Sequence, residues 1–216
     1  NLTAESDLDI VATVLAGAVA VAGGIAGGGF ATTGAGASSV NKIAADVRAF
    51  IDGDGSGSQG ISGKSITLSA VDKSKITADT EAALVAVAFG SAAASVAVGV
   101  SLAENEIDNL VEASISNADA VKTTQDQVSI TASEEATIDS VTQAASAAAA
   151  IGLGGSSASG VTNAKNILTS EVKTFISKSQ VNSAKDVLVS ASDKSKIAAE
   201  IDSFALSVGL VSIAVG

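Results

Sequence analysis

The sequence predicts an all-β protein, built as a parallel β-helix or β-solenoid from repeats of about 60 residues. Three observations support this prediction. Two motifs recur at that spacing, large apolar residues alternate with small or polar ones at a period of two, and proline is absent. The lack of proline suits strands that are hydrogen-bonded on both edges. An antiparallel, β-sandwich-like arrangement within each repeat is the alternative architecture.

The first motif begins at an asparagine and ends at an isoleucine further along the chain. Its three copies run from Asn41 to Ile51, from Asn105 to Ile115 and from Asn166 to Ile176. The starts of successive copies are separated by nearly equal intervals. We expect these six residues to have repeated structural roles, because an asparagine at a corner can hydrogen-bond the backbone of a turn.

The second motif begins with an apolar residue and ends with an isoleucine. Its four copies begin at Leu2, Leu68, Ile130 and Val189. Together the motifs divide one continuous domain, residues 1–216, into repeats at about 2–67, 68–129, 130–188 and a partial 189–216. We expect the chain to be a segment of a longer tandem array.

The spacing of apolar runs predicts strands of about five to eight residues, grouped into about three coils of roughly 20 residues per repeat, with a rise of ~4.8 Å per coil. In that geometry the three motif asparagines lie in coils that do not touch. A continuous asparagine ladder is therefore not expected.

Long stretches of small apolar residues follow the second motif. The stretch Ala82 to Ala103 is uncharged and as long as a membrane span, but its period of two predicts two strands around "GSAAAS" and no membrane span. The alanine-rich stretch Thr137 to Gly152 is the one place where a helix is the alternative. We expect large residues to fill the interior, and small ones to let a second sheet or a neighbouring chain approach.

The composition excludes several kinds of chemistry. The chain has no His, Cys, Met, Trp, Tyr or Pro, so it lacks imidazole bases, thiolate nucleophiles and the usual zinc ligands. A net charge of -11 argues against nucleic acid as a partner. No arrangement of carboxylates with the single Arg48 resembles a catalytic groove, and the protein is not expected to be an enzyme.

The stretch "DGDGSGSQGISG" raises the question of calcium. Asp52, Asp54 and Ser56 occupy positions 1, 3 and 5 of an EF-hand-like loop and are the candidate metal ligands. Position 12, which needs a bidentate carboxylate, is Gly63. The equivalent segments of the other repeats lack these aspartates. An ordinary surface corner is therefore the favoured interpretation, and no other cofactor is expected.

Charged clusters recur in the second motif, as "VDKSKI" after Ala70 and "SDKSKI" after Ala191. The simpler interpretation is a solvated turn with local ion pairs among Asp72, Lys73 and Lys75, and among Asp193, Lys194 and Lys196. Pairing between the charged stripes of neighbouring molecules is the alternative.

The succession of "ITLSAVDKSKITA", an Ala/Gly/Val stretch, "NEIDNLVEASI" and a variable corner resembles the repeats of giant bacterial surface proteins, the adhesin-like and filamentous-haemagglutinin-like proteins. That resemblance implies an extracellular or cell-surface, non-catalytic structural module of a fibre, adhesion or biofilm-matrix protein. The expected partners are copies of the chain, end to end and laterally, and a cell surface or matrix polysaccharide. A calcium- or carbohydrate-binding adhesin module is the alternative, weakened by the lack of Trp and Tyr.

Overall fold

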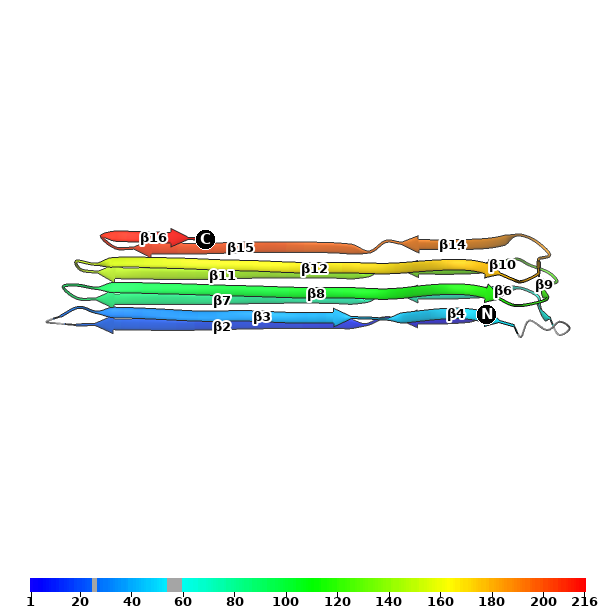
Figure 1. Cartoon of the computed structure of the whole chain (residues 1–216), viewed down its shortest axis with the longest axis horizontal. Coiled ribbons are helices and arrows are strands. Elements are labelled where there is room, and N and C mark those ends of the chain that lie inside the picture. The colour runs from blue at the N-terminus through cyan, green and yellow to red at the C-terminus, as the bar shows by residue number, and fades with distance from the viewer. Residues whose placement is uncertain (25–26, 54–59) are drawn as a thin grey trace.

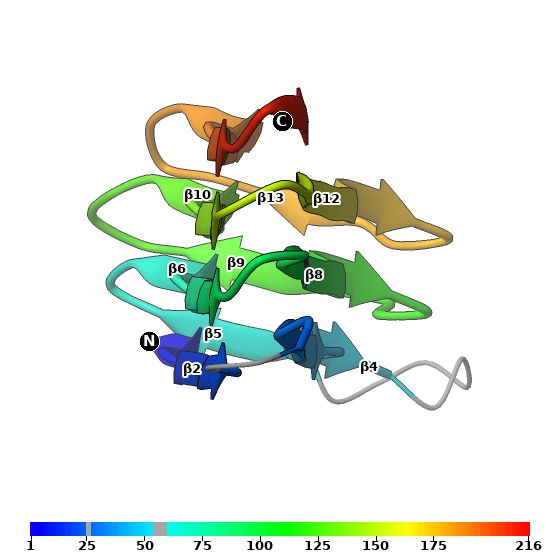
Figure 2. The same cartoon turned by 90° about the vertical axis from the view of Figure 1, so that its left-hand side faces the viewer.

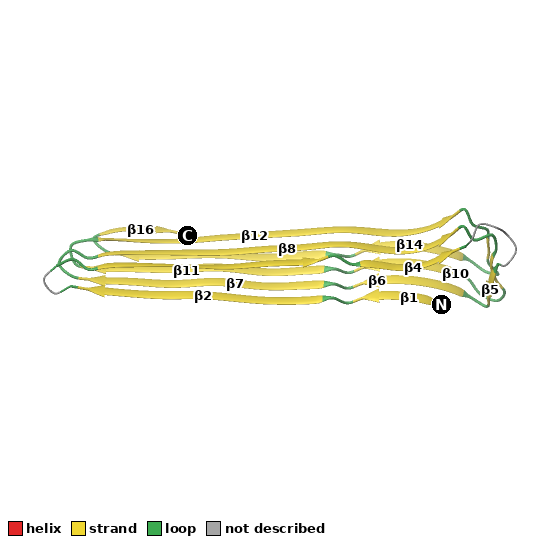
Figure 3. Ribbon diagram, turned by 60° about the horizontal axis from the view of Figure 1, so that its bottom comes forward, coloured by secondary structure: helices red, strands yellow, loops and turns green. Residues whose placement is uncertain are grey.

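The computed structural model describes residues 1–24, 27–53 and 60–216, and its regular structure is entirely β-strand (Figure 3). The all-β prediction is confirmed. The alanine-rich stretch for which a helix was the alternative forms strand β11 (Thr137–Ile151). Within the described ranges no helix is long and apolar enough to cross a membrane.

The strands form four sheets, and every pairing among the described residues is parallel, which argues against the antiparallel alternative. Sheet A contains β1 (Leu2–Ser6), β6 (Ile66–Asp72), β10 (Val128–Glu134) and β14 (Val187–Asp193). Sheet B contains β2 (Asp9–Gly23), β7 (Lys75–Phe89), β11 and β15 (Lys196–Val208). Sheet C contains β3 (Phe30–Ile43), β4 (Asp46–Asp52), β8 (Ala94–Ser116), β12 (Gly155–Ser177) and β16 (Val211–Val215). The short sheet D contains β5 (Ile61–Gly63), β9 (Val121–Thr123) and β13 (Val181–Asn182).

The chain runs as a series of flattened layers that lie on top of one another (Figures 1 and 2). In the first layer β1 and β2 follow one long side, β3 and β4 return along the other, and β5 lies at the end where the next layer begins (Figure 3). Sheets A and B therefore share one long face of the molecule, and sheet C forms the opposite face.

Hydrogen-bonded neighbours in adjacent layers occupy the same position of successive motif copies. Leu2 lies beside Leu68, Leu68 beside Ile130, and Ile130 beside Val189. The spacing between motif copies therefore corresponds to one layer, and the expectation of three coils within that spacing is wrong. The strands are also longer than expected, because the alternating pattern continues through the polar positions between motifs; β8 and β12 have 23 residues each.

The interior changes in character along the long axis. Where sheet A faces sheet C, large buried residues such as Leu68, Ile115 and Ile130 are packed together with alanines. Where sheet B faces sheet C near the turns, the cluster of buried residues is entirely alanine: Ala31, Ala86, Ala88, Ala93, Ala97, Ala148, Ala150 and Ala158. From Val85 to the turn the larger residues of β7 face outward; Val85, for example, is 40% exposed, whereas Leu84, one position earlier, is buried. The expectation that large residues fill the interior is therefore wrong for the part nearest the turns, whereas Ile76 and Ile107 are buried between the same two sheets further from the turns.

Close approach of the two sheets explains the reversal. A Cβ added at the inward-facing Gly99 would lie 2.7 Å from Leu84 Cδ1 on the opposite sheet. At the turns the backbone itself requires glycine, since Gly90 and Gly152 have φ angles of 149° and 140°. The turn after Phe89 is the one predicted around "GSAAAS".

Candidate functional site

The three motif asparagines form a hydrogen-bonded column inside the molecule. Asn41 Nδ2 donates to Asn105 Oδ1 at 2.8 Å, and Asn105 Nδ2 donates to Asn166 Oδ1 at 2.8 Å. Asn105 is fully buried, so each of its amide atoms depends on the ladder for a partner. The expectation that the three would not touch is wrong, because corresponding residues of successive motif copies lie in adjacent layers.

The three motif isoleucines form a second column, further along the same sheet. Ile51 and Ile176 are the Cα partners of Ile115, on either side of it. Ile115 is fully buried in the large-residue cluster, and the other two pack against that cluster from the outer layers. These residues contribute apolar packing rather than chemistry.

A column of carboxyl side chains at the ends of the sheet A strands was not predicted. Asp72, Glu134 and Asp193 are register partners at the ends of β6, β10 and β14, and the first two are fully buried. The solvated-turn interpretation is therefore wrong for Asp72. The sequence did contain a signal for this column. All three acidic residues occupy the same position of the second motif, and in-register stacking of the repeats brings equivalent positions together.

Polar groups of sheet C and of the turn between β6 and β7 donate hydrogen bonds to this acidic column. Asn109 Nδ2 donates to Asp72 Oδ2 at 2.8 Å and to Glu134 Oε1 at 3.3 Å. The amide and hydroxyl of Ser74 donate to Asp72 at 3.1 and 2.8 Å, and the hydroxyl of Ser170 donates to Glu134 Oε1 at 2.6 Å. Within the described part of the chain, the buried Glu134 Oε2 has no hydrogen-bond partner.

Burial raises the pKa of Glu134, because it disfavours the charged form of the carboxyl. Hydrogen bonds from Ser170 and Asn109 oppose this effect, while the neighbouring Asp72 and Asp193 add to it. The charged form of Glu134 is therefore disfavoured in the folded protein, and its hydrogen bonds offset the cost of burial only in part.

The exposed charges in the same turns pair between layers. Lys73 Nζ lies 2.9 Å from Glu5 Oε1, and Lys194 Nζ lies 3.4 Å from Glu135 Oε1. On sheet C, Lys42 pairs with Glu106 at 2.9 Å, and Lys165 pairs with Glu104 at 2.6 Å. The lysine clusters thus contribute cross-layer ion pairs within one molecule.

The proposed calcium loop is described only at its first ligand. Asp52 ends β4, and its Oδ1 accepts a hydrogen bond of 2.8 Å from Asn117 Nδ2 in the next layer. Asp54 and Ser56 lie outside the described residues. Across residues 1–24, 27–53 and 60–216, no group of three or more acidic side chains is placed to hold a metal ion. The calcium hypothesis therefore stays a prediction.

An apolar patch covers the outer face of sheet B near the turns. It comprises the outward positions in the last part of each strand: Gly17, Val19, Val21, Gly23, Ala83, Val85, Val87, Phe89, Ala145, Ala147, Ala149, Ile151, Phe204, Leu206 and Val208. None of these residues is polar. The outer face of sheet C is more mixed, since Thr32, Ser159 and Asn163 interrupt its apolar residues.

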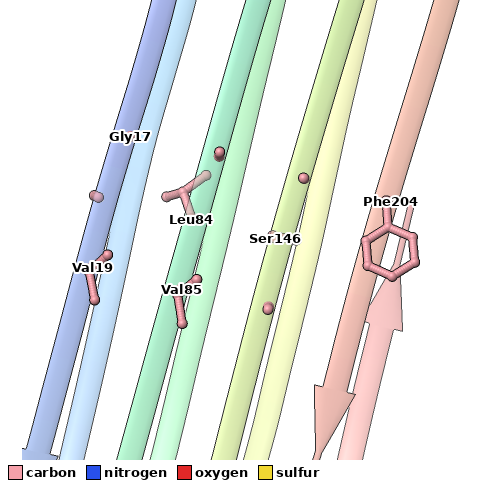
Figure 4. Close-up of a pocket in the computed structure, with 10 residues that line it drawn as sticks. Gly17, Val19, Leu84, Val85, Ser146 and Phe204 are labelled. Atoms are coloured by element: carbon pink, nitrogen blue, oxygen red, sulfur yellow. The ribbon is translucent and has the colours of Figure 1, made fainter.

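A shallow groove of about 450 Å³ crosses this patch (Figure 4). Its floor includes the small residues Gly17, Ala83 and Ala145, and Val19 and Val85 rise along one side. In the fourth strand, Phe204 occupies the groove position. The arrangement offers apolar surface and shape, and it has none of the convergent polar groups of a small-molecule site.

Comparison with protein-family models, curated proteins and solved structures finds no match. The resemblance to adhesin-like repeats therefore stays a prediction, as do the expected absence of enzymatic activity and the extracellular location.

Proposed function

We propose that the chain is a β-solenoid of tandem repeats, with one layer per repeat, and that its function is structural and non-catalytic. In this proposal it is a segment of a secreted bacterial surface or extracellular fibre protein. One observation carries the proposal: the corresponding motif positions are neighbours in adjacent layers, as in the hydrogen-bonded column Asn41–Asn105–Asn166.

In-register pairing of each layer with the next is enough to build an extended stack from such a sequence. Each layer pairs with the next along nearly its whole length; β7 and β11 pair from Lys75 to Phe89, and β8 and β12 pair from Ser95 to Ser116. In repeat architectures of this kind stability is a sum of layers and of the interfaces between neighbouring layers. Adding repeats therefore extends the body without requiring a new core.

The proposal assigns two kinds of partner. Strand edges in the outermost layers present main-chain donors and acceptors, and further layers or copies of the chain would pair there end to end. A cell surface or matrix polysaccharide is the proposed adhesive target, which the resemblance to adhesin-like repeats suggests.

Electron microscopy of the purified chain, together with glycan-binding and calcium-titration measurements, tests the proposal. The expected result is elongated particles that assemble with increasing concentration and show no hydrolytic or transfer activity. Particles that remain discrete monomers and bind a sugar or calcium stoichiometrically would instead support the alternative adhesin module.

A further inference from the structure

We propose that the apolar patch of sheet B is a lateral docking surface for a second copy of this chain, with the two copies related by a two-fold axis parallel to the direction in which the layers stack. This inference rests on the structural function proposed above and identifies a surface for its self-association.

The patch is exposed even in the middle layers, where neighbouring strands cover each residue on two sides. Val85 is 40% exposed and Phe89 is 42% exposed. Their large side chains face outward because the inward positions between them, Ala86 and Ala88, are fully buried against sheet C. An uninterrupted apolar surface on four adjacent strands is typical of an interaction site.

In the two middle strands, β7 and β11, the patch is complementary in shape to itself under the proposed axis; in β2 the corresponding positions Gly17 and Gly23 are both small, and in β15 the large Phe204 begins the patch. The small residues Ala83 and Ala145 begin the patch, and the large residues Phe89 and Ile151 end it in the same two strands. A two-fold axis parallel to the stack reverses the strand direction and keeps each layer at its own height. Phe89 of one copy then faces Ala83 of the other, in the groove, and Ile151 faces Ala145.

A second two-fold axis, parallel to the strands, would also bring the two patches face to face. The positions of the charged residues distinguish the proposed axis from this rival axis. In two of the four strands, β7 and β15, acidic residues occupy the outward positions next to the patch, including Asp79, Glu81 and Glu200. A two-fold axis along the strands would keep the strand direction and place the acidic region of one copy over the acidic region of the other, which is unfavourable between like charges. The axis along the stack places the acidic positions of each copy beyond the turns of its partner, so the two acidic regions do not meet.

The area of the patch sets the strength of the contact. Four outward positions along a strand span ~20 Å and four layers span ~19 Å, which gives about 400 Å² of footprint. A stable protein–protein contact buries about 800 Å² on each partner. The four layers therefore supply about half of a standard interface. Association should be weak and dependent on concentration, and it should strengthen with added salt, which screens the repulsion between chains of charge -11.

Sedimentation velocity on two matched variants tests the location of the contact. Val85→Asp adds a carboxylate to the patch, and Val98→Asp adds one at an equally exposed position of the opposite face, since Val98 is 41% exposed. We expect Val85→Asp to weaken association at least roughly tenfold, because docking would bury an unpaired charge. Val98→Asp should associate like the unmodified chain, and circular dichroism should show unchanged strand content in both.

Thiol cross-linking tests the axis, because the chain contains no cysteine. Facing sheets pack ~10 Å apart, so a bis-maleimide reagent of that reach can join opposed positions. A mixture of Ala83→Cys and Phe89→Cys chains should give a cross-linked dimer, while each variant alone should not. Cross-linking of Phe89→Cys to itself would indicate the rival axis and overturn the proposal.

The outcomes separate this inference from the proposed structural function. If the unmodified chain assembles but Val85→Asp assembles equally well, the lateral surface is refuted and end-to-end stacking remains. If the unmodified chain stays monomeric at every concentration and salt, both the lateral surface and the self-associating function are wrong.

Discussion

Truncation of Asn105 to alanine tests the asparagine column at its centre. Asn105 is fully buried and uses its side-chain amide in both directions, accepting from Asn41 and donating to Asn166, each at 2.8 Å. Its removal leaves the Nδ2 of Asn41 and the Oδ1 of Asn166 without these partners. Asn41 is only 8% exposed, so solvent cannot readily replace the lost contact there.

The expected cost follows from counting those groups. A buried polar group that loses its partner costs ~1–3 kcal/mol, so two such groups give roughly 2–6 kcal/mol; because Asn166 is only partly buried, we expect about 3 kcal/mol, in the lower half of that range. For a chain of this size, that corresponds to a fall in Tm of about 6–12 °C. Asn41→Ala removes one hydrogen bond of the same column and should cost about half as much.

Urea and thermal denaturation followed by circular dichroism measure these differences. Asn163→Ala is the matched control, because Asn163 is an exposed asparagine in the same strand as Asn166. Its effect should stay within about 0.5 kcal/mol. Equal costs for Asn105→Ala and Asn163→Ala would refute the column as a source of stability, and equal costs for Asn105→Ala and Asn41→Ala would contradict the count of two lost contacts against one.

Two further predictions concern the acidic column and the turns. The raised pKa of Glu134 means that its contribution to stability is complete below the ordinary carboxyl pKa and is lost as pH rises through the raised value. Glu134→Gln should therefore reduce the loss of stability between about pH 4 and pH 7 and raise the urea midpoint at pH 7; an unchanged pH profile would count against the burial argument. Gly152→Ala should destabilise strongly, since φ is 140° and the added Cβ would clash with the carbonyl oxygen of Gly90, whereas Gly17→Ala should be tolerated because its nearest contact is 3.5 Å. Similar melting temperatures for these two variants would contradict the turn geometry.

Much of the fold follows from the sequence, because strand periodicity and motif spacing are local signals. The two strands around "GSAAAS" end at Phe89 and begin again at Ala94, close to where alternation and small residues place them. The number of layers per repeat was not predictable in the same way. The number of layers depends on whether the chain turns at small polar residues or passes through them as one strand. The strand β8, which is continuous from Ala94 to Ser116, shows that the chain passes through them.

The functional surfaces were less predictable for a related reason. Alternation shows that Val85 and Ala86 face opposite sides, but it does not show which side is buried. Size suggested that Val85 was inside. The close packing of sheets B and C instead selects alanine for the interior. Likewise, Asp72 and Glu134 are residue types that are usually exposed in turns. Their burial is explained by the hydrogen bonds that they accept from Ser74, Asn109 and Ser170 on neighbouring segments.

The arrangement of one layer per repeat is the central claim, and spin labelling of paired cysteines tests it most directly. Thr77 and Asp139 are outward-facing Cα partners in adjacent layers of sheet B, and Val98 lies in the long strand that follows Thr77, on the opposite face. Labels at Thr77→Cys and Asp139→Cys should show strong dipolar broadening, because neighbouring strands are ~4.8 Å apart. Labels at Thr77→Cys and Val98→Cys, which three short coils per repeat would bring together, should show none. Strong broadening in the second pair and its absence in the first would contradict the layered architecture and the structural function built on it.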